Sequence, residues 1–222
     1  MVGASRGLGY AMAAEFAGRG WRVIGTVRTA QTPLHALAAE RPSSVEVATL
    51  DMTHHDQIRR LRASLSNRLF DIVFVNGGIV NRTPSETMAA VSTNEFVEVM
   101  ATNVLGAMRA VEELGALTRP GGVVGVMSSG QGSITNNTNG ANDLYRASKA
   151  ALNQAMSSYA GRHGTERAII LMAPGWIRTE MGGPHAPFGV EDAMPEIVDV
   201  LAAQQDHPGL RYLDRKGQAV PW

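Results

Sequence analysis

Tyr145 and Lys149, in the segment "YRASK", have residue types and a spacing suited to proton transfer. Residues four apart share one face of a helix, so the phenol and the ammonium would lie close together. A lysine charge beside a phenol favours the phenolate and lowers a tyrosine pKa that is ordinarily about 10. Such a tyrosine could act as a general acid or base near neutral pH. The pair is common in proteins, but here Ser129 precedes it at the end of an apolar, strand-like segment.

The opening segment "MVGASRGLGY" carries glycines at positions Gly3, Gly7 and Gly9. Glycines allow tight turns and let a pyrophosphate approach a helix N-terminus, whose free N–H groups favour anions. A plain turn into a helix is the alternative. The segment Asn76–Gly78 follows another apolar run, and it predicts a second place where the backbone lies close to a ligand, or else a simple turn.

Two arginines indicate which nucleotide would bind. Arg28 follows the second apolar strand segment, where NAD-preferring enzymes usually carry an acidic residue, and Arg6 lies inside the glycine turn. Two guanidiniums could hold the 2′-phosphate of NADP through charge-assisted hydrogen bonds. Two solvated surface arginines are the alternative. We expect NADP(H) as the cofactor, and NAD less so.

Short apolar segments alternate with helical ones along the whole chain. Strands are expected over 21–27, 44–50, 71–75, 121–129, 167–173 and 210–213, and helices over 8–20, 32–41, 54–67, 93–114, 144–163 and 191–204. Strands that are apolar on both faces and alternate with helices indicate a parallel sheet covered on each side. The sequence therefore predicts a single, doubly wound, Rossmann-like α/β domain over residues 1–222, with ligands at the carboxyl ends of the strands.

Composition excludes several classes of partner and site. Twenty basic residues balance twenty acidic ones, which argues against nucleic acid or an anionic membrane as a partner. The chain has no cysteine, no apolar run of membrane-spanning length and no signal-peptide pattern, so the cytoplasm is expected. Its six histidines show no metal-ligand spacing, and no metal is predicted.

Together these motifs resemble the short-chain dehydrogenase/reductase family over nearly the whole chain. The family's glycine motif corresponds to Val2–Gly9 and its Asn-Asn-Ala-Gly to Val75–Gly78. "SSGQGSI", "YRASKAALN", "PGWIRTEMGGPHAP" and "GQAVPW" look like the branch of C-factor proteins and sniffer-type carbonyl reductases. The resemblance implies hydride transfer between a nicotinamide and a small carbonyl or alcohol substrate.

The resemblance also implies a role for each matching residue. Tyr145 would be the general acid or base, Ser129 would hold the carbonyl oxygen, and Asn103 would anchor a proton-relaying water. Lys149 would bind the nicotinamide ribose and lower the tyrosine pKa. The implied cofactor-binding residues are Gly3, Ser5, Arg6, Gly7, Leu8, Gly9, Arg28, Asp51, Met52, Asn76, Gly77, Gly78, Tyr145, Lys149, Pro174, Gly175, Ile177 and Thr179. Helices near 96–118 and 147–163 would form a homodimer or homotetramer.

The chain departs from the family pattern in three places. Only Met1 and Val2 stand where the family has its first strand, so that strand is expected to be truncated. Upstream residues could supply it, neighbouring elements could close the gap, or the nucleotide site could be impaired. Val75 replaces an asparagine, and fifteen residues separate Ser129 from Tyr145, with Ser128 as the substitute serine. The alternative function is nucleotide sensing or signalling of the C-factor type with little or no turnover.

Overall fold

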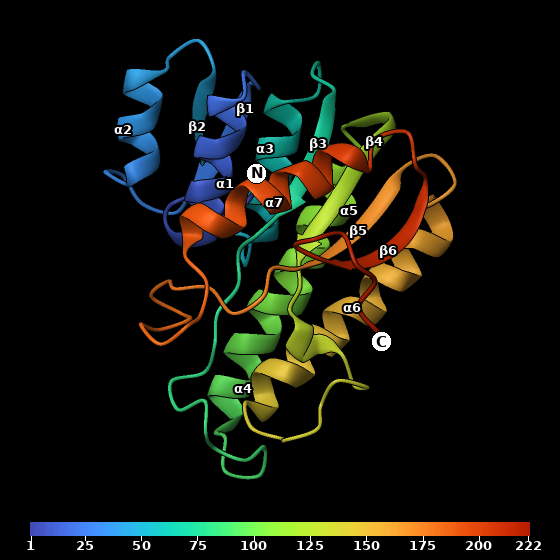
Figure 1. Cartoon of the computed structure of the whole chain (residues 1–222). Helices are drawn as coiled ribbons and strands as arrows, with labels where there is room; N and C mark the ends of the chain where they lie inside the picture. The colour runs from blue at the N-terminus through green and yellow to red at the C-terminus, as the bar shows by residue number, and fades with distance from the viewer.

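The computed structural model describes residues 1–222 and shows parallel strands covered by helices (Figure 1). The strands are β1 (Val23–Val27), β2 (Val45–Thr49), β3 (Phe70–Val75), β4 (Thr118–Met127), β5 (Ala168–Ala173) and β6 (Gly209–Asp214). The α-helices are α1 (Gly7–Gly18), α2 (Pro33–Glu40), α3 (His55–Ser64), α4 (Thr93–Met100), α5 (Ala107–Gly115), α6 (Asp143–His163) and α7 (Val190–Ala203). None of these helices is both long enough and apolar enough to cross a membrane.

The strands bury both of their faces. In β5 all six residues of "AIILMA" are buried, as expected for an inner strand of a parallel sheet. Val123 and Ile170 pack in one apolar cluster with α1 and α7, whereas their neighbours Val124 and Ile169 pack with α5 and α6. Consecutive residues thus point to opposite faces, and helices cover both. The predicted doubly wound α/β fold is confirmed.

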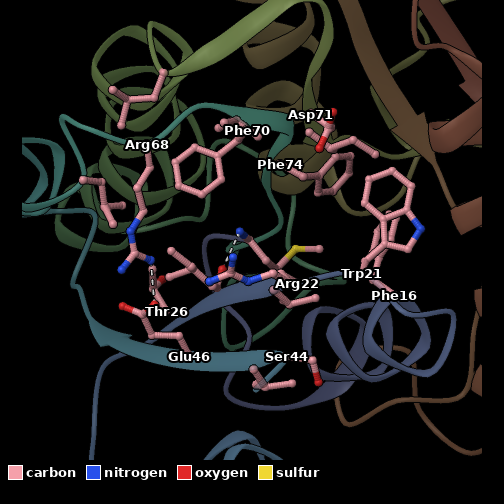
Figure 2. Close-up of a pocket in the computed structure, with 18 of the residues that line it drawn as sticks. Phe16, Trp21, Arg22, Thr26, Ser44, Glu46, Arg68, Phe70, Asp71 and Phe74 are labelled. Carbon is pink, nitrogen blue, oxygen red and sulfur yellow. Dashed lines mark hydrogen bonds and ion pairs between the residues drawn. The ribbon is translucent and has the colours of Figure 1, made fainter. Parts of the chain in front are cut away.

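The strands form two separate parallel sheets. β1 pairs with β2, and β3, β4, β5 and β6 pair in that order. Residues 1–4 lie between β1 and β3: Val2 forms an isolated parallel bridge with Val75, and Ala4 N–H donates to the Thr26 carbonyl at 2.8 Å. They are too few to form a strand, so the expected truncation is observed. A cavity of about 980 Å³ extends from Met1 between β1 and β3 (Figure 2).

The long helix expected over 93–114 is interrupted. Ser92 caps α4 by accepting the Glu95 N–H at 3.2 Å, as expected for a serine at this position. A π-helical segment, Ala101–Gly106, then separates α4 from α5. π-helical turns inside α-helices frequently occur at functional sites, and this one contains Asn103.

Candidate active site

The segments expected to carry chemistry gather at the carboxyl ends of the strands. Asn76 follows β3, Ser129 lies two residues after β4, and Pro174 follows β5. Ser5 lies in the glycine turn, while Gly7 and Leu8 begin α1. Because parallel strands end at one edge of a sheet, segments far apart in sequence meet there.

The two glycine segments pack directly on each other. Gly3 has a φ of 82°, and a Cβ on it would lie 2.8 Å from the Gly77 nitrogen. A Cβ on Gly9 would lie 2.0 Å from the Gly3 carbonyl oxygen, to which the Asn76 amide donates at 3.0 Å. No side chain caps α1, so its first N–H groups are available to an anion. This cradle fits a dinucleotide pyrophosphate.

Lys149, on α6, is buried, and its side chain reaches the end of β4. Its Nζ donates to the Met127 carbonyl at 2.9 Å, and burial lowers its pKa from 10.5 to about 8. A Cβ on Gly78 would lie 3.3 Å from Nζ, so the ammonium and the second glycine segment face each other. The ammonium has further N–H groups to donate to a ligand.

Tyr145 differs from the expectation in its acidity. Burial raises the pKa of Tyr145 to about 12, although hydrogen bonding with Ser129 acts in the opposite direction. Lys149 Nζ lies 5.7 Å from the tyrosine ring centroid, and its charge does not offset the loss of water around the phenol. The predicted lowering of this pKa is therefore not found, and the phenol is protonated at neutral pH and can donate a proton.

The structure distinguishes the two serines. Ser128 is buried, and its hydroxyl donates to Asn153 Oδ1 at 2.5 Å. The Ser129 hydroxyl accepts the Gln131 N–H at 3.1 Å. Its hydrogen bond with Tyr145 acts to lower the pKa of that phenol. Ser129 therefore holds the position beside the phenol, and Ser128 supports the loop behind it.

Asn103 joins the loop after β3 to helix α6. Its Oδ1 accepts the Ile79 N–H at 2.8 Å, and its Nδ2 donates to the Ile79 carbonyl at 2.8 Å and to Ser148 Oγ at 3.0 Å. The Ser148 hydroxyl donates in turn to the Tyr145 carbonyl at 2.7 Å. The Asn103 side chain thus braces the backbone of Tyr145; its expected role of anchoring a water stays a prediction.

Tyr212 on β6 is a site residue that the sequence did not indicate. Its hydroxyl donates to the Ser129 carbonyl, and hydrogen bonding with Asn153 and Ser128 partly offsets the effect of burial, which raises the pKa of Tyr212. The Trp222 ring lies 5.4 Å from the Tyr212 ring, centroid to centroid. An aromatic residue in a short strand resembles ordinary core, so only the tertiary fold identifies it.

Asp51 and Met52 follow β2 beside the glycine segments. The Asp51 carboxylate accepts the Thr53 N–H at 2.9 Å and its hydroxyl at 2.7 Å. Burial raises the pKa of Asp51, but the two hydrogen bonds from Thr53 and the neighbouring positive charge lower it. The net result is a pKa below the ordinary value. The Met52 methyl would lie 2.9 Å from a Cβ on Gly77, so this side chain closes the floor of the turn.

Arg6 and Arg28, the two arginines expected to bind the 2′-phosphate, are both exposed, and Arg6 forms an ion pair within the chain. Arg6 forms an ion pair with Glu180, and both side chains are largely exposed. Arg28 is also exposed, and its charge contributes to the lowered pKa of Asp51. Glu180 therefore competes for the guanidinium that was expected to hold a phosphate.

The loop after β5 passes from the strand end to α7. Gly175 turns this loop with a φ of 89°. Ile177 is buried and forms an isolated parallel β-bridge with Phe188. Thr179 Oγ1 accepts the Gly182 N–H at 3.0 Å, so its hydroxyl shapes a local turn. The chain also has no group of three or more His, Cys, Asp or Glu side chains that could hold a metal ion.

The glycine cradle at the N-terminus of α1 is accompanied by Ser129 after β4 and by Tyr145 and Lys149 on α6, a set of residues suited to a nucleotide-binding oxidoreductase. The sequence profile of the family "short chain dehydrogenase" matches residues 1–187. The chain belongs to the short-chain dehydrogenase/reductase family.

Relatives agree with this assignment. C-signal of Myxococcus xanthus is 32% identical over 68% of this chain and 92% of its own. A short-chain dehydrogenase/reductase from Burkholderia multivorans with bound NADP has a TM-score of 0.98 and 54% identity over 100% of this chain and 97% of its own. A carbonyl reductase from Pseudomonas aeruginosa PAO1 in complex with NADP has a TM-score of 0.91 and 33% identity over the same shares. The expected resemblance to C-factor-like and carbonyl reductase proteins is confirmed.

Proposed function

We propose that this protein is an NADPH-dependent reductase of a small carbonyl compound. The observation that carries the proposal is the position of the Tyr145 phenol, on α6, beside Ser129 and Lys149. The fit of the dinucleotide is supported by the glycine cradle. Backbone atoms there leave no room for a Cβ on Gly3 or Gly9, so these positions carry no side chain. It is further supported by the NADP bound in the Burkholderia and Pseudomonas relatives. The bound nicotinamide would supply the hydride for the carbonyl carbon.

Each residue of the chain then has one task. Ser129 donates a hydrogen bond to the carbonyl oxygen, and Tyr145 transfers its phenolic proton to that oxygen as charge develops there. The carbonyl carbon gains a hydride and the oxygen gains a proton, which yields the alcohol and leaves a tyrosinate. Lys149 donates to the nicotinamide ribose and stabilises this tyrosinate with its charge until a proton from water restores the phenol.

The remaining expected residues hold the dinucleotide. We assign the pyrophosphate to the turn from Gly3 to Gly9, the adenine to Asp51 and Met52, and the nicotinamide to the segment from Pro174 to Thr179. Arg28 and Arg6 bind the 2′-phosphate. To do so, Arg6 gives up its ion pair with Glu180 and pairs with the phosphate instead. This exchange favours NADPH over NADH, because only NADPH offers a second anion to the arginines.

The test is NADPH oxidation by the purified chain with a panel of small aldehydes and ketones. We expect absorbance loss that depends on the carbonyl compound and is faster with NADPH than with NADH. Binding of NADPH without oxidation across the panel would instead support the alternative, a nucleotide-sensing protein with little turnover. The likeness to C-signal favours that second candidate. A cytoplasmic homodimer or homotetramer of one 222-residue domain, with neither nucleic acid nor membrane as a partner, remains part of the proposal.

A further inference from the structure

The loop over residues 133–142 connects the segment that carries Ser129 with helix α6, which carries Tyr145 (Figure 1). It contains the pair Asn139–Gly140, and both residues are exposed. In such a pair the backbone nitrogen of the glycine can attack the side-chain carbonyl carbon of the asparagine, because glycine has no Cβ to obstruct the approach. The proposed reaction assigns no task to this pair.

The chain has two Asn-Gly pairs, and the fold holds the other one rigidly. Asn76–Gly77 lies in the glycine cradle, where Asn76 Nδ2 donates to the Gly3 carbonyl at 3.0 Å. The Gly77 N–H donates to the Val2 carbonyl at 3.2 Å. Asn76 Nδ2 also lies 2.6 Å from the place of a Cβ on Gly9, so the amide packs closely against α1. Attack within this pair would require the cradle to open.

Arg146 acts on the side-chain amide of Asn139. Its Nη2 donates to Asn139 Oδ1 at 3.0 Å, while its Nε donates to the Ala141 carbonyl at 2.8 Å and so fixes the guanidinium beside the loop. A charge-assisted bond to Oδ1 draws electrons from the carbonyl carbon. It also stabilises the negative oxygen that forms when a nitrogen attacks that carbon. The guanidinium therefore lowers the barrier to this attack.

The backbone after Asn139 is strained and weakly held. Gly140, Ala141 and Asn142 have φ values of 67°, 64° and 57°, a left-handed conformation that is costly for alanine. The Gly140 N–H donates to Asn137 Oδ1 at 3.2 Å, and both residues are exposed. Hydrogen bonds on an exposed loop open readily, so the Gly140 nitrogen becomes free to react.

We propose that Asn139–Gly140 is a site of spontaneous covalent modification, at which Arg146 promotes conversion of Asn139 to aspartate or isoaspartate. The Gly140 nitrogen forms a bond to Asn139 Cγ and loses its proton. The Cγ–Nδ2 bond breaks, and ammonia leaves with that proton, which gives a cyclic imide. Water then opens the imide at either carbonyl and is the only co-reactant.

Both products alter the loop beside the proposed site. Aspartate places a carboxylate against the Arg146 guanidinium, directly after Tyr145, where the two can form an ion pair. Isoaspartate routes the main chain through its own Cβ, which adds one backbone atom between Ser129 and Tyr145. Ser129 and Tyr145 themselves are unchanged, so the modification acts on their surroundings.

The experiment follows both Asn-Gly pairs by tryptic peptide mapping and mass spectrometry during incubation at mildly alkaline pH. In the folded chain, we expect Asn139 to convert at least about tenfold faster than Asn76, because only Asn139 lies on an open loop. In urea, where neither pair is held, the two should convert at comparable rates. Asn139→Gln should abolish conversion in the peptide that contains this loop.

Variants of the arginine test its part in the reaction. Arg146→Gln should slow conversion of Asn139 in the folded chain by at least about threefold, because the charge-assisted bond is lost. Arg146→Lys keeps a cationic donor and should retain most of the rate. Arg60→Gln, which removes a surface arginine on α3, is the control for net charge and should convert like the parent chain.

Equal conversion of Asn139 and Asn76 in the folded chain would overturn the proposal. Equal or faster conversion in Arg146→Gln would contradict promotion by the guanidinium. Conversion that persists in Asn139→Gln would place the modification on another residue of the loop. These readouts need neither nucleotide nor turnover, so failure of the proposed reductase activity leaves them unaffected.

Discussion

The Tyr212 hydroxyl on β6 donates a hydrogen bond to the backbone carbonyl of Ser129. That backbone carries the hydroxyl that lies beside Tyr145, so a residue from the last strand fixes the position of the serine. The C-terminal Trp222 packs against Tyr212, and its carbonyl accepts the Thr135 N–H at 3.0 Å. The end of the chain thus supports the loop that follows Ser129.

Tyr212→Phe should lower kcat while leaving NADPH affinity unchanged. Phenylalanine keeps the ring contact with Trp222 and removes only the hydrogen bond to Ser129, which is worth about 0.5–1.5 kcal/mol and corresponds to roughly a 2–10-fold loss. Steady-state kinetics and calorimetric titration with NADPH provide the two readouts. Tyr159→Phe, on the same helix as Tyr145 but outside the site, is the control and should keep the parent kcat. An equal loss in both variants would show that Tyr212 has no specific role.

Lys149→Met should remove a pH dependence of stability. Burial lowers the pKa of Lys149 from 10.5 to about 8, so the unfolded chain binds more protons than the folded chain between these values. The free energy of unfolding should therefore rise with pH in this window, by about 2 kcal/mol from pH 8 to pH 10. Tyr145 acts in the opposite direction only above its ordinary pKa of 10.0, because burial raises that pKa to about 12.

Urea unfolding at pH 8, 9 and 10 measures this dependence. The Lys149→Met chain should show little rise over the range. Lys216→Met is the matched control, because the other lysine of the chain is exposed and its loss should leave the rise intact. A rise of the same size in Lys149→Met would contradict the burial of a charged lysine as its cause.

Gly9→Ala should abolish NADPH binding and destabilise the fold. The new Cβ would lie 2.0 Å from the Gly3 carbonyl oxygen, so the glycine turn would have to open. Gly18→Ala, in the same helix, has no atom within 4 Å of the new Cβ and should raise stability by about 0.5–1 kcal/mol. Calorimetry and thermal unfolding compare the two; NADPH affinity retained in Gly9→Ala would place the pyrophosphate elsewhere.

Arg28→Ala should weaken NADPH binding by roughly 10–100-fold, because charge-assisted hydrogen bonds contribute about 1.5–3 kcal/mol. NADH lacks the 2′-phosphate, so its affinity should stay the same. Arg60→Ala, which removes a surface arginine paired with Asp56 on α3, is the control for net charge. Equal losses for NADPH and NADH in Arg28→Ala would refute the phosphate contact.

Local patterns predicted most of the elements but not their tertiary consequences. The apolar run of β5 and the helical spacing of Tyr145 and Lys149 are properties of a few neighbouring residues, and both were predicted. The π-helical turn at Asn103 was missed, since it depends on packing against the loop at Ile79. The pKa of Tyr145 was predicted in the wrong direction, because burial by distant segments exceeds the effect of a neighbouring lysine.

The most direct test of the account is turnover by Tyr145→Phe with a carbonyl compound that the parent chain reduces. Proton donation by Tyr145 predicts a loss in kcat of at least about 100-fold, with NADPH binding retained in a calorimetric titration. Tyr159→Phe should again keep the parent rate. Unchanged turnover in Tyr145→Phe would contradict the central claim that this phenol supplies the proton.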